Sequence, residues 1–359
     1  MTKSPEQVHR VLGIMSGSSL DGLDVASCTF QLENNRWNHQ IEAAETFSYD
    51  NDLAGALSNL NEITAESFVN VDIRLGRFIG NAINRFIRAH NLKNIDYIAS
   101  HGHTAFHNPS KGYSTQIGNG AIIAATTRIP TITDFRSLDV ALDGQGAPLV
   151  PIGDALLFSE YDFCLNLGGY SNISFDQQGK RIAFDICPVN KAINYLARQE
   201  GKEMDKDGQM AARGSVDGTL LDNLNNLNFY HTPPPKSLGD EWLKNEFLEV
   251  LKDASGLSLH DQLRTVYEHI AIQIQKASEH TTNGTILVTG GGAHNRFLID
   301  RIRESNTNRI VIPENELIEF KEALIFAFMG VLRSKGMTNC LASVTGASRD
   351  STGGVVYSV

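Results

Sequence analysis

The chain has 359 residues, of which 41% are apolar and 20% are charged. This length predicts about two domains at roughly 100 to 200 residues per domain, and the composition excludes disordered, collagenous and coiled-coil proteins. Lys and Arg number 31 against 41 Asp and Glu, so the formal charge is -10. Such a surface repels a phosphate backbone, and we expect no nucleic-acid partner.

The cysteine pattern and the absence of long apolar runs indicate the compartment. Cys28, Cys164, Cys187 and Cys340 lie far apart with no C-x-x-C pair, which supports neither a zinc knuckle nor a dense disulfide framework. The polar residues 1–10 contain no signal-peptide core, and no run approaches 18 apolar residues. We therefore expect a cytoplasmic protein with no membrane partner.

In the first part of the chain, the hydrophobic spacing predicts three strands, a long helix and a fourth strand. The strands are expected at 11–15, 23–30, 37–49 and 95–100, and the helix at 64–90.

A similar order follows later in the chain. Strands are expected at 163–167, 173–175, 181–184 and 285–289, and helices at 190–200, 217–227, 259–278 and 294–304. The two halves share this order without a residue-level repeat, which predicts an α/β protein of two stacked domains with a cleft between them. We place domain I at 1–133 plus 347–359 and domain II at 134–346. The last strand, 353–357, is expected to pair back onto the first.

A turn of small residues, Ser16-Gly17-Ser18-Ser19-Leu20-Asp21-Gly22, separates the first two strands. Its backbone N–H groups and hydroxyls can approach a phosphate, and Asp21 and Asp24 can hold a hydrated Mg²⁺. The turn lacks a G-K-[ST] ending and precedes a strand, so it is not a Walker A loop. A tight hairpin without a ligand is the alternative.

Two further glycine turns follow predicted strands. Gly168-Gly169-Tyr170-Ser171-Asn172 reads as a second tight hairpin, and Gly290-Gly291-Gly292-Ala293-His294-Asn295 precedes a helix. Glycines let a phosphate or a flat ring lie against the backbone, and a helix N-terminus favours negative charge. Glycines that only turn the chain after a strand are the alternative.

Asp185 ends a predicted strand shortly before Pro188, a residue that suits the first turn of a helix. Its carboxylate is therefore either a helix N-cap or a general base in the cleft, where partial desolvation would raise its basicity.

His101, His103 and His107 form an H-x-H-x3-H pattern that is compatible with a metal site. No acidic or Cys ligand stands nearby at a familiar spacing, so hydrogen bonding to a polar ligand is the preferred interpretation.

Several motifs resemble one known family. Gly13 to Asp24 resembles the G-x-M-S-G-T-S-x-D-G-x-D signature of anhydro-N-acetylmuramic acid kinases, with Ser18 in the Thr position. Further matches follow in family order along nearly the whole chain: Ser100–Thr104, Thr133–Arg136, Gly144–Pro151, Leu165–Asn172, Gly290–Asn295, Glu322–Leu324 and Ser343–Ala347. The motif Gly144-Gln145-Gly146-Ala147-Pro148-Leu149-Val150-Pro151 matches the family's G-Q-G-A-P-L-V-P in full.

The resemblance implies an actin-like sugar-kinase fold of two ribonuclease-H-like domains that close on ATP and Mg²⁺, and a homodimer. It implies that water opens the 1,6-anhydro bridge of anhydro-N-acetylmuramic acid and that the freed O6 is phosphorylated, in cell-wall recycling. A sugar kinase for another amino sugar and a nucleotide-binding module without catalysis are the alternatives. ATP consumption with and without the anhydro-sugar distinguishes catalysis from binding alone.

The family's D-T-G-P-G-N motif, whose Asp activates the water, aligns with Asp185-Ile186-Cys187-Pro188-Val189-Asn190. Its Lys-Ser-Thr-Gly-Arg-Glu stretch appears as Lys236-Ser237-Leu238-Gly239-Asp240-Glu241, without the Arg. The expected site is therefore Asp185 as the base; ATP and phosphate contacts from Gly17, Ser18, Ser19, Leu20, Asp21, Gly22, Leu23, Asp24, Gly168, Gly169, Asn172, Gly290, Gly291, Gly292 and Asn295; sugar contacts from His103, Thr104, Arg136, Asn190 and Glu322; and Mg²⁺ at Asp21 and Asp24.

Overall fold

The computed structural model describes residues 7–17 and 20–359. By its contacts the chain divides into two compact units, Met1–Leu157 with Phe320–Val359, and Phe158–Glu319. The boundaries expected at 133/134 and 346/347 both fall inside the first unit.

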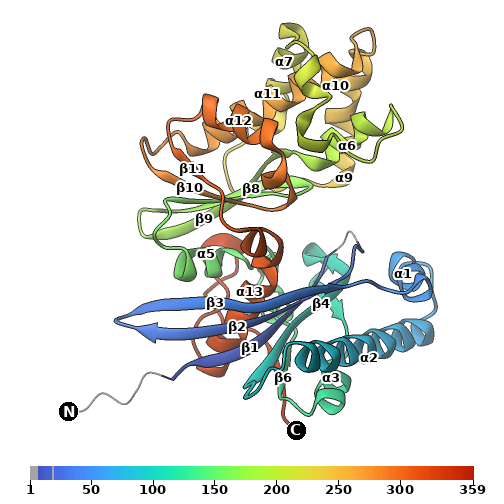
Figure 1. The fold of residues 1–359 in the computed structure, drawn as a ribbon, viewed down its shortest axis with the longest axis vertical. Helices are drawn as coiled ribbons and strands as arrows, with labels where there is room; N and C mark the ends of the chain where they lie inside the picture. Colours follow the sequence, from blue (N-terminus) through green and yellow to red (C-terminus); the bar gives the residue numbers. More distant parts are fainter. Residues whose placement is uncertain (1–6, 18–19) are drawn as a thin grey trace. The chain divides into compact units, whose positions relative to one another are not determined.

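The first unit is built on a mixed sheet. Its strands in the described residues are β1 (His9–Ser16), β2 (Leu23–Glu33), β3 (Arg36–Phe47), β4 (Tyr97–Asn108), β5 (Tyr113–Ile117), β6 (Thr131–Thr133) and β12 (Val355–Tyr357). They lie in the order β12-β6-β4-β1-β2-β3, and β5 pairs with β4 (Figure 1). β1, β2 and β3 are antiparallel, whereas β4 runs parallel to both β1 and β6.

Helices cover both faces of this sheet. They are α1 (Asn51–Ser58), α2 (Ala65–Ala89), α3 (Gly120–Thr127), α4 (Ser137–Ala141), α5 (Pro151–Leu157), α13 (Asn315–Ser334), which contains the unit boundary, and α14 (Ala342–Thr345). Leu12 and Ile14 of β1 pack in one core with Leu75 and Ile79 of α2. The intervening Gly13 faces α13 so closely that a Cβ would overlap the Ala323 carbonyl oxygen. The alternation of β1 thus places α2 and α13 on opposite faces.

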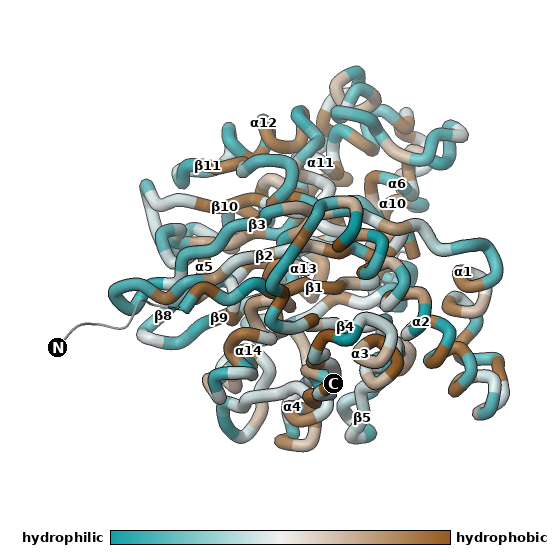
Figure 2. Tube along the Cα trace, turned by 60° about the horizontal axis from the view of Figure 1, so that its bottom comes forward, coloured by the Kyte–Doolittle hydropathy of each residue, from teal (hydrophilic) through white to brown (hydrophobic). Residues whose placement is uncertain are grey.

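The sequence pattern of α2 explains why it forms where predicted. Thr64 caps it by accepting from the Ser67 N–H, and hydrophobic residues recur on the buried side. The trace of α2 accordingly alternates between hydrophobic and hydrophilic colours in Figure 2. The sequence pattern does not predict the buried helix α13, because the middle of this helix is hydrophobic all round and shows no single apolar face.

The second unit has its own sheet and core. The strands are β7 (Phe163–Leu167), β8 (Tyr170–Gln177), β9 (Lys180–Pro188), β10 (Thr285–Thr289) and β11 (Arg309–Val311), in the order β11-β10-β7-β8-β9. The helices are α6 (Asn190–Arg198), α7 (Gly218–Asn225), α8 (Asn228–His231), α9 (Asp240–Trp242), α10 (Leu248–Asp253), α11 (Leu259–Ser278) and α12 (Arg296–Ser305), with a π-helical turn at Leu243–Phe247 between α9 and α10. Tyr267 and Ile270 of α11 are fully buried in this core.

Both units repeat one topology. In each sheet the first three strands are antiparallel, and the next two in the order run parallel to the first. This third-second-first-fourth-fifth order is the ribonuclease-H-like arrangement, so the predicted α/β class and the shared architecture of the two halves are confirmed.

Three local predictions were wrong. β12 pairs antiparallel with β6 and not with β1, because β4 already occupies that edge of β1. The turn after β7 is shorter than predicted, since β8 begins at Tyr170. β9 continues past its predicted end at 184 to Pro188, so Pro188 belongs to the strand and not to the first turn of a helix, whereas α6 begins at Asn190 as predicted. Among the described residues, no helix has the length and apolar character needed to cross a membrane.

Candidate active site

The two glycine turns of the second unit lie together. β7 and β10 are parallel neighbours, so both turns leave the same edge of the sheet. Gly290 has φ 81° and ψ 162°, and a Cβ there would overlap Asn166 Oδ1 and come within 2.9 Å of the Leu167 carbonyl carbon. A Cβ added to Gly291 would contact only Asn190 Nδ2, at 3.8 Å. Gly290 is therefore required for packing, whereas Gly291 leaves open space for a ligand.

Asn190 connects these turns to α6. Its Nδ2 donates to the Leu167 carbonyl at 3.3 Å, and its backbone N–H donates to the Gly168 carbonyl at 3.2 Å. The backbone N–H groups of Val189 and Lys191 both donate to the Gly169 carbonyl. The Gly168-Gly169 turn therefore takes the place of a side-chain cap, and Asn190, predicted to bind the sugar, lies beside the predicted phosphate turns.

Asp185 belongs to a row of polar residues across the sheet. The strand registers pair Thr289 with Asn166, Asn166 with Asn172, and Asn172 with Asp185. Paired residues on neighbouring strands project from the same face. The register shifts at this point, and Ile186 is the extra residue of a bulge in β9. Bulges of this kind re-aim side chains next to active sites.

The contacts of Asp185 rule out the helix-cap alternative. The N-cap residue of α6 is Val189, with no side-chain cap. Asp185 Oδ2 accepts instead from the Leu238 N–H at 2.8 Å, and the Asp185 N–H donates to the Lys236 carbonyl at 3.1 Å. Desolvation raises the pKa of Asp185, and the hydrogen bond from Leu238 opposes that rise. A half-buried carboxylate with a raised pKa is a better proton acceptor than an exposed one.

The residues that differ from the D-T-G-P-G-N pattern face the core. Ile186, Cys187 and Val189 are buried in the hydrophobic cluster of the second unit. Burial raises the pKa of Cys187 to about 12, so its thiol is inert at neutral pH. The added bulk of this loop is therefore accommodated by the core.

Two predicted phosphate contacts, Asn295 and Leu23, have side chains in other surroundings, and a third, Asn172, does not. Asn295 caps α12 by accepting from the Leu298 N–H at 3.1 Å, and its Nδ2 donates to the Tyr267 hydroxyl at 2.7 Å. Leu23 is fully buried, so only its backbone could face a ligand. Asn172, in contrast, is exposed.

The predicted turn of the first unit joins β1 to β2. Ser18 and Ser19 lie outside the described residues, and Gly17 and Leu20 flank them, with the Leu20 N–H 3.4 Å from the Gly17 carbonyl oxygen. Asp21 is exposed.

The residues that follow this turn pack against the end of β3. A Cβ on Gly22 would lie 2.6 Å from Thr46 Cγ2, and the Thr46 hydroxyl donates to Asp24 Oδ1 at 2.6 Å. The oxygen donors of Asp21 and Asp24 fit a Mg²⁺ that keeps several waters and shares phosphate ligands.

Side chains from β4 and from the segment that follows β3 form hydrogen bonds at the end of β1. Ser16 Oγ lies 3.0 Å from His103 Nδ1 and accepts from the Tyr49 hydroxyl at 2.7 Å. The neighbouring Thr104 hydroxyl accepts from Gln116 Nε2 at 3.3 Å. His103 and Thr104, predicted to bind the sugar, therefore sit beside the predicted phosphate turn.

Arg136 is held between a histidine and a backbone carbonyl. Its Nε donates to His101 Nε2 at 3.0 Å, and its Nη1 donates to the Gly146 carbonyl. Burial lowers the pKa of Arg136 to about 10, and the nearby Glu322 opposes this shift. Desolvation raises the pKa of Glu322, Arg136 lowers it, and Asp24 adds to the rise. Two predicted sugar contacts and one predicted Mg²⁺ ligand are thus electrostatically coupled.

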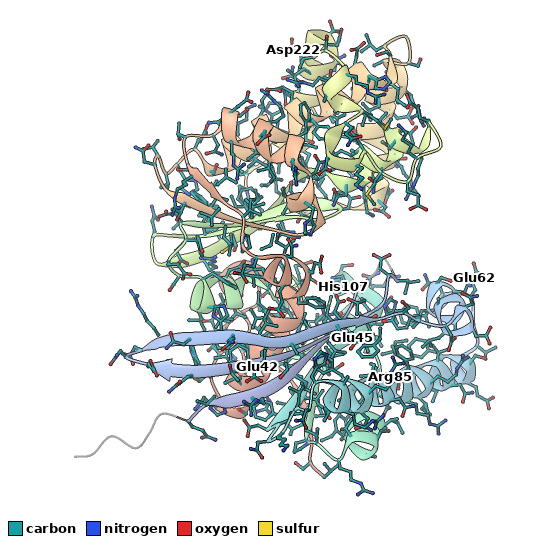
Figure 3. All side chains as sticks on the ribbon, viewed as in Figure 1. Glu42, Glu45, Glu62, Arg85, His107 and Asp222 are labelled. Carbon is teal, nitrogen blue, oxygen red and sulfur yellow. The ribbon has the colours of Figure 1, made fainter. Side chains whose placement is uncertain are left out.

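The three histidines do not form a metal site. His101 Nε2 accepts from Arg136, and its Nδ1 lies 2.9 Å from the Gly102 carbonyl oxygen, so the ring is a neutral tautomer. His107, labelled in Figure 3, lies farther along β4 with its Nδ1 3.0 Å from Ser114 Oγ. Among residues 7–17 and 20–359, no cluster of three or more His, Cys, Asp or Glu could hold a metal.

His101 predicts acid sensitivity of the first unit. Desolvation and Arg136 lower its pKa from 6.5 to about 3, so the unfolded state binds a proton that the folded state does not. Stability should therefore fall as the pH drops from 6.5 toward 3. We expect His101→Gln to lower the difference in bound protons between the unfolded and folded states by about one. The pH slope of the free energy of unfolding measures this difference, from urea unfolding followed by Trp37 fluorescence in a Trp242→Phe background. An unchanged pH slope would contradict the assignment.

Several site residues were missed by the sequence analysis. Asn166 touches the Gly290 turn, and its place before two glycines on a buried strand was an available signal. Tyr49 had no local signal, because only the pairing of β3 with β2, and of β2 with β1, brings it to Ser16. Lys191 and Asp240 also come together only in the folded chain.

Comparison with known proteins gives one consistent result. A family model described as anhydro-N-acetylmuramic acid kinase matches residues 9–359. A protein of that name from Sulfurimonas denitrificans is 31% identical, and the alignment covers 96% of this chain and 98% of the relative. One from Synechococcus elongatus is 34% identical, covering 97% and 99% respectively.

Two solved structures show a weaker similarity. Component A of (R)-2-hydroxyglutaryl-CoA dehydratase from Acidaminococcus fermentans has 13% identity and a TM-score of 0.43, covering 89% of this chain and 96% of that one. Hexokinase from Schistosoma mansoni in complex with glucose has 10% identity and a TM-score of 0.34, covering 90% and 85%. The match of the family model over nearly the whole chain, at the residues that build both turns and the polar row, shows that the chain belongs to the anhydro-N-acetylmuramic acid kinase family.

Proposed function

We propose that this protein is an ATP-dependent kinase that opens 1,6-anhydro-N-acetylmuramic acid with water and phosphorylates O6, giving N-acetylmuramic acid 6-phosphate in peptidoglycan recycling. The placement of Asp185 carries the proposal. Its carboxylate is half-buried and oriented by backbone at the end of a polar row beside two glycine turns. This arrangement suits a base next to a phosphate-binding region.

The proposed reaction is the one that the family resemblance implies. Asp185 accepts a proton from a water molecule while that oxygen forms a bond to the anomeric carbon. The bond from the anomeric carbon to O6 breaks, and O6 keeps the electron pair. O6 then attacks the γ-phosphorus of ATP, and ADP leaves. The Asp185 carboxylate thus supplies base catalysis only to the first of these bond changes.

The rest of the site is assigned to binding. Gly17–Gly22, Gly168-Gly169 and Gly290–Gly292 are proposed to bind ATP phosphates through the backbone. The residues proposed to bind the sugar are His103, Thr104, Arg136, Asn190 and Glu322. Mg²⁺, held by Asp21 or Asp24 together with phosphate oxygens, would neutralise charge on the transferred phosphoryl group. The two ribonuclease-H-like units are proposed to be the two kinase domains. The nucleotide cleft between the domains, the homodimer and the cytoplasmic location stay predictions.

Gly17→Val tests the first phosphate turn. A branched side chain at this position would occupy the space proposed for phosphate, so ATP affinity should fall more than ten-fold, about 1.4 kcal/mol, while the fold persists. Isothermal titration calorimetry measures the affinity and circular dichroism the fold. If ATP binds as tightly as to the wild type, this turn does not bind phosphate.

Product analysis tests the reaction itself. The protein is incubated with ATP, Mg²⁺ and a panel of amino sugars in ¹⁸O-labelled water, and the products are read by mass spectrometry. The proposal requires a phosphorylated product from the anhydro-sugar, with label at the anomeric carbon under conditions where anomeric exchange is excluded. Phosphorylation of a different, non-anhydro sugar would identify an ordinary sugar kinase, and ATP binding without turnover would identify a binding module.

A further inference from the structure

The segment at residues 236–240 orients the carboxylate of Asp185. The Lys236 carbonyl accepts from the Asp185 N–H, and the Leu238 N–H donates to Asp185 Oδ2. This segment has no regular secondary structure until α9 begins at Asp240. Its position must therefore be maintained by contacts with the rest of the unit.

Asp240 supplies such contacts. The Tyr170 hydroxyl donates to Asp240 Oδ1 at 2.8 Å, and Lys191 Nζ forms an ion pair with the same oxygen. Lys191 Nζ also lies 5.0 Å from the centroid of the Tyr170 ring. The three side chains come from β8, α6 and α9, so this cluster connects the start of α9 to β8, which follows the Gly168-Gly169 turn, and to α6, whose first N–H groups donate to that turn. Lys191 and Tyr170 lower the pKa of Asp240, which keeps the carboxylate ionised at neutral pH.

The cluster is also braced against the glycine turn. A Cβ on Gly169 would lie 3.2 Å from Lys191 Cγ and Cε, so the aliphatic part of Lys191 runs directly over this residue. The family pattern has Arg at the position of Asp240, and this chain reverses that charge. Lys191, on a neighbouring helix, supplies the compensating cation.

We propose that Tyr170, Lys191 and Asp240 form a clamp that positions Asp185, by holding the start of α9 so that the Leu238 N–H stays on the carboxylate. The three are positioning residues, and the kinetic part of this inference rests on the proposed function. The ion pair of Lys191 and Asp240 is exposed, since 40% of the Lys191 side chain and 61% of the Asp240 side chain are accessible to solvent. Exposed ion pairs contribute little to global stability, so removing the clamp should loosen the segment without unfolding the unit.

Kinetics of Lys191→Met and Asp240→Asn test the clamp. Each should lower kcat by about ten-fold, less than the 10²-fold that an ångström of misplacement can cost, with KM for ATP nearly unchanged. The acidic limb of kcat/KM should move to higher pH, because the hydrogen bond from Leu238 lowers the pKa of Asp185. Tyr170 on β8 interacts electrostatically with Asp185, and the Lys236 carbonyl accepts from the Asp185 N–H; both residues remain in these variants.

The double variant and two controls sharpen this test. Both substitutions break one clamp, so the double variant should be no slower than either single variant. Lys191→Arg keeps the cation and should restore most of the activity. Lys252→Met removes an equally exposed ion pair with Glu249 on α10 and should leave the kinetics unchanged. A raised KM in Lys191→Met with normal kcat in Asp240→Asn would show direct ligand binding by Lys191 and overturn the clamp.

Hydrogen exchange measured by mass spectrometry separates the clamp from the reaction. Peptides that cover residues 236–243 should exchange faster in Lys191→Met and Asp240→Asn than in the wild type, with melting temperatures within a few degrees. If the wild type turns over no anhydro-sugar, the proposed function fails but this measurement still decides the clamp. Unchanged exchange in both variants would overturn it.

Discussion

Asp185→Asn is expected to lower turnover of the anhydro-sugar by roughly 10²- to 10⁴-fold. Asn keeps the size of the side chain and can still accept from the Leu238 N–H, but it cannot take the proton of the attacking water. ATP and sugar should still bind, because the substitution leaves the glycine turns and Asn190 in place. Steady-state kinetics together with calorimetric binding measure the two effects separately.

Stability gives an independent check on this variant. The pKa of Asp185 is raised above 3.8 in the folded protein, because burial disfavours the charged form. The folded state therefore retains the proton to higher pH than the unfolded state, and this carboxyl costs stability once the pH rises through the raised pKa. Asp185→Asn should thus be at least as stable as the wild type at neutral pH. Normal turnover in a stable variant would contradict the base role.

Gly290→Ala is expected to destabilise the second unit by about 2 to 4 kcal/mol and to abolish tight ATP binding. Its backbone, with φ 81° and ψ 162°, lies in a region essentially reserved for glycine. A Cβ would also overlap Asn166 Oδ1 and crowd the backbone of Leu167. The turn must then move away from β7, and both effects follow from that displacement.

Gly291→Ala is the matched control. The nearest atom to its Cβ would be Asn190 Nδ2, at 3.8 Å, and its φ is not positive, so the fold should tolerate it. Urea unfolding followed by Trp242 fluorescence in a Trp37→Phe background reports the second unit. Equal midpoints for the two alanine variants would contradict the packing role of Gly290, whereas weaker ATP binding in Gly291→Ala alone would indicate a ligand at that residue.

Strands with a clear alternation or a short apolar run could be predicted from the sequence. β7 and β10 lie at the predicted residues, and α11 has the predicted bounds. These elements have local causes, namely hydrophobic period, capping residues and glycines at their ends. The family motifs could be recognised for the same reason, because each is a contiguous string.

The arrangement around Asp185 could not be predicted from the sequence. A bulge at Ile186 depends on how β9 pairs with β8, and the contact with Leu238 joins residues 53 positions apart. Continuation of β9 to Pro188 removes Pro188 from the expected first turn of a helix, because pairing with Tyr170 extends the strand. The family resemblance indicated that Asp185 is the base. The residues that surround its carboxylate are known only from the folded structure.

The strand-turn pattern, the two-unit α/β organisation and the family can be predicted from the sequence, since local hydrophobic period and contiguous motifs specify them. The folded chain alone shows that Gly290 packs on Asn166, that Asn295 donates to Tyr267 and that Lys191 meets Asp240. Each of these depends on contacts between segments distant in the chain. Such contacts arise from the shape of the packed elements, which no local pattern of side chains encodes.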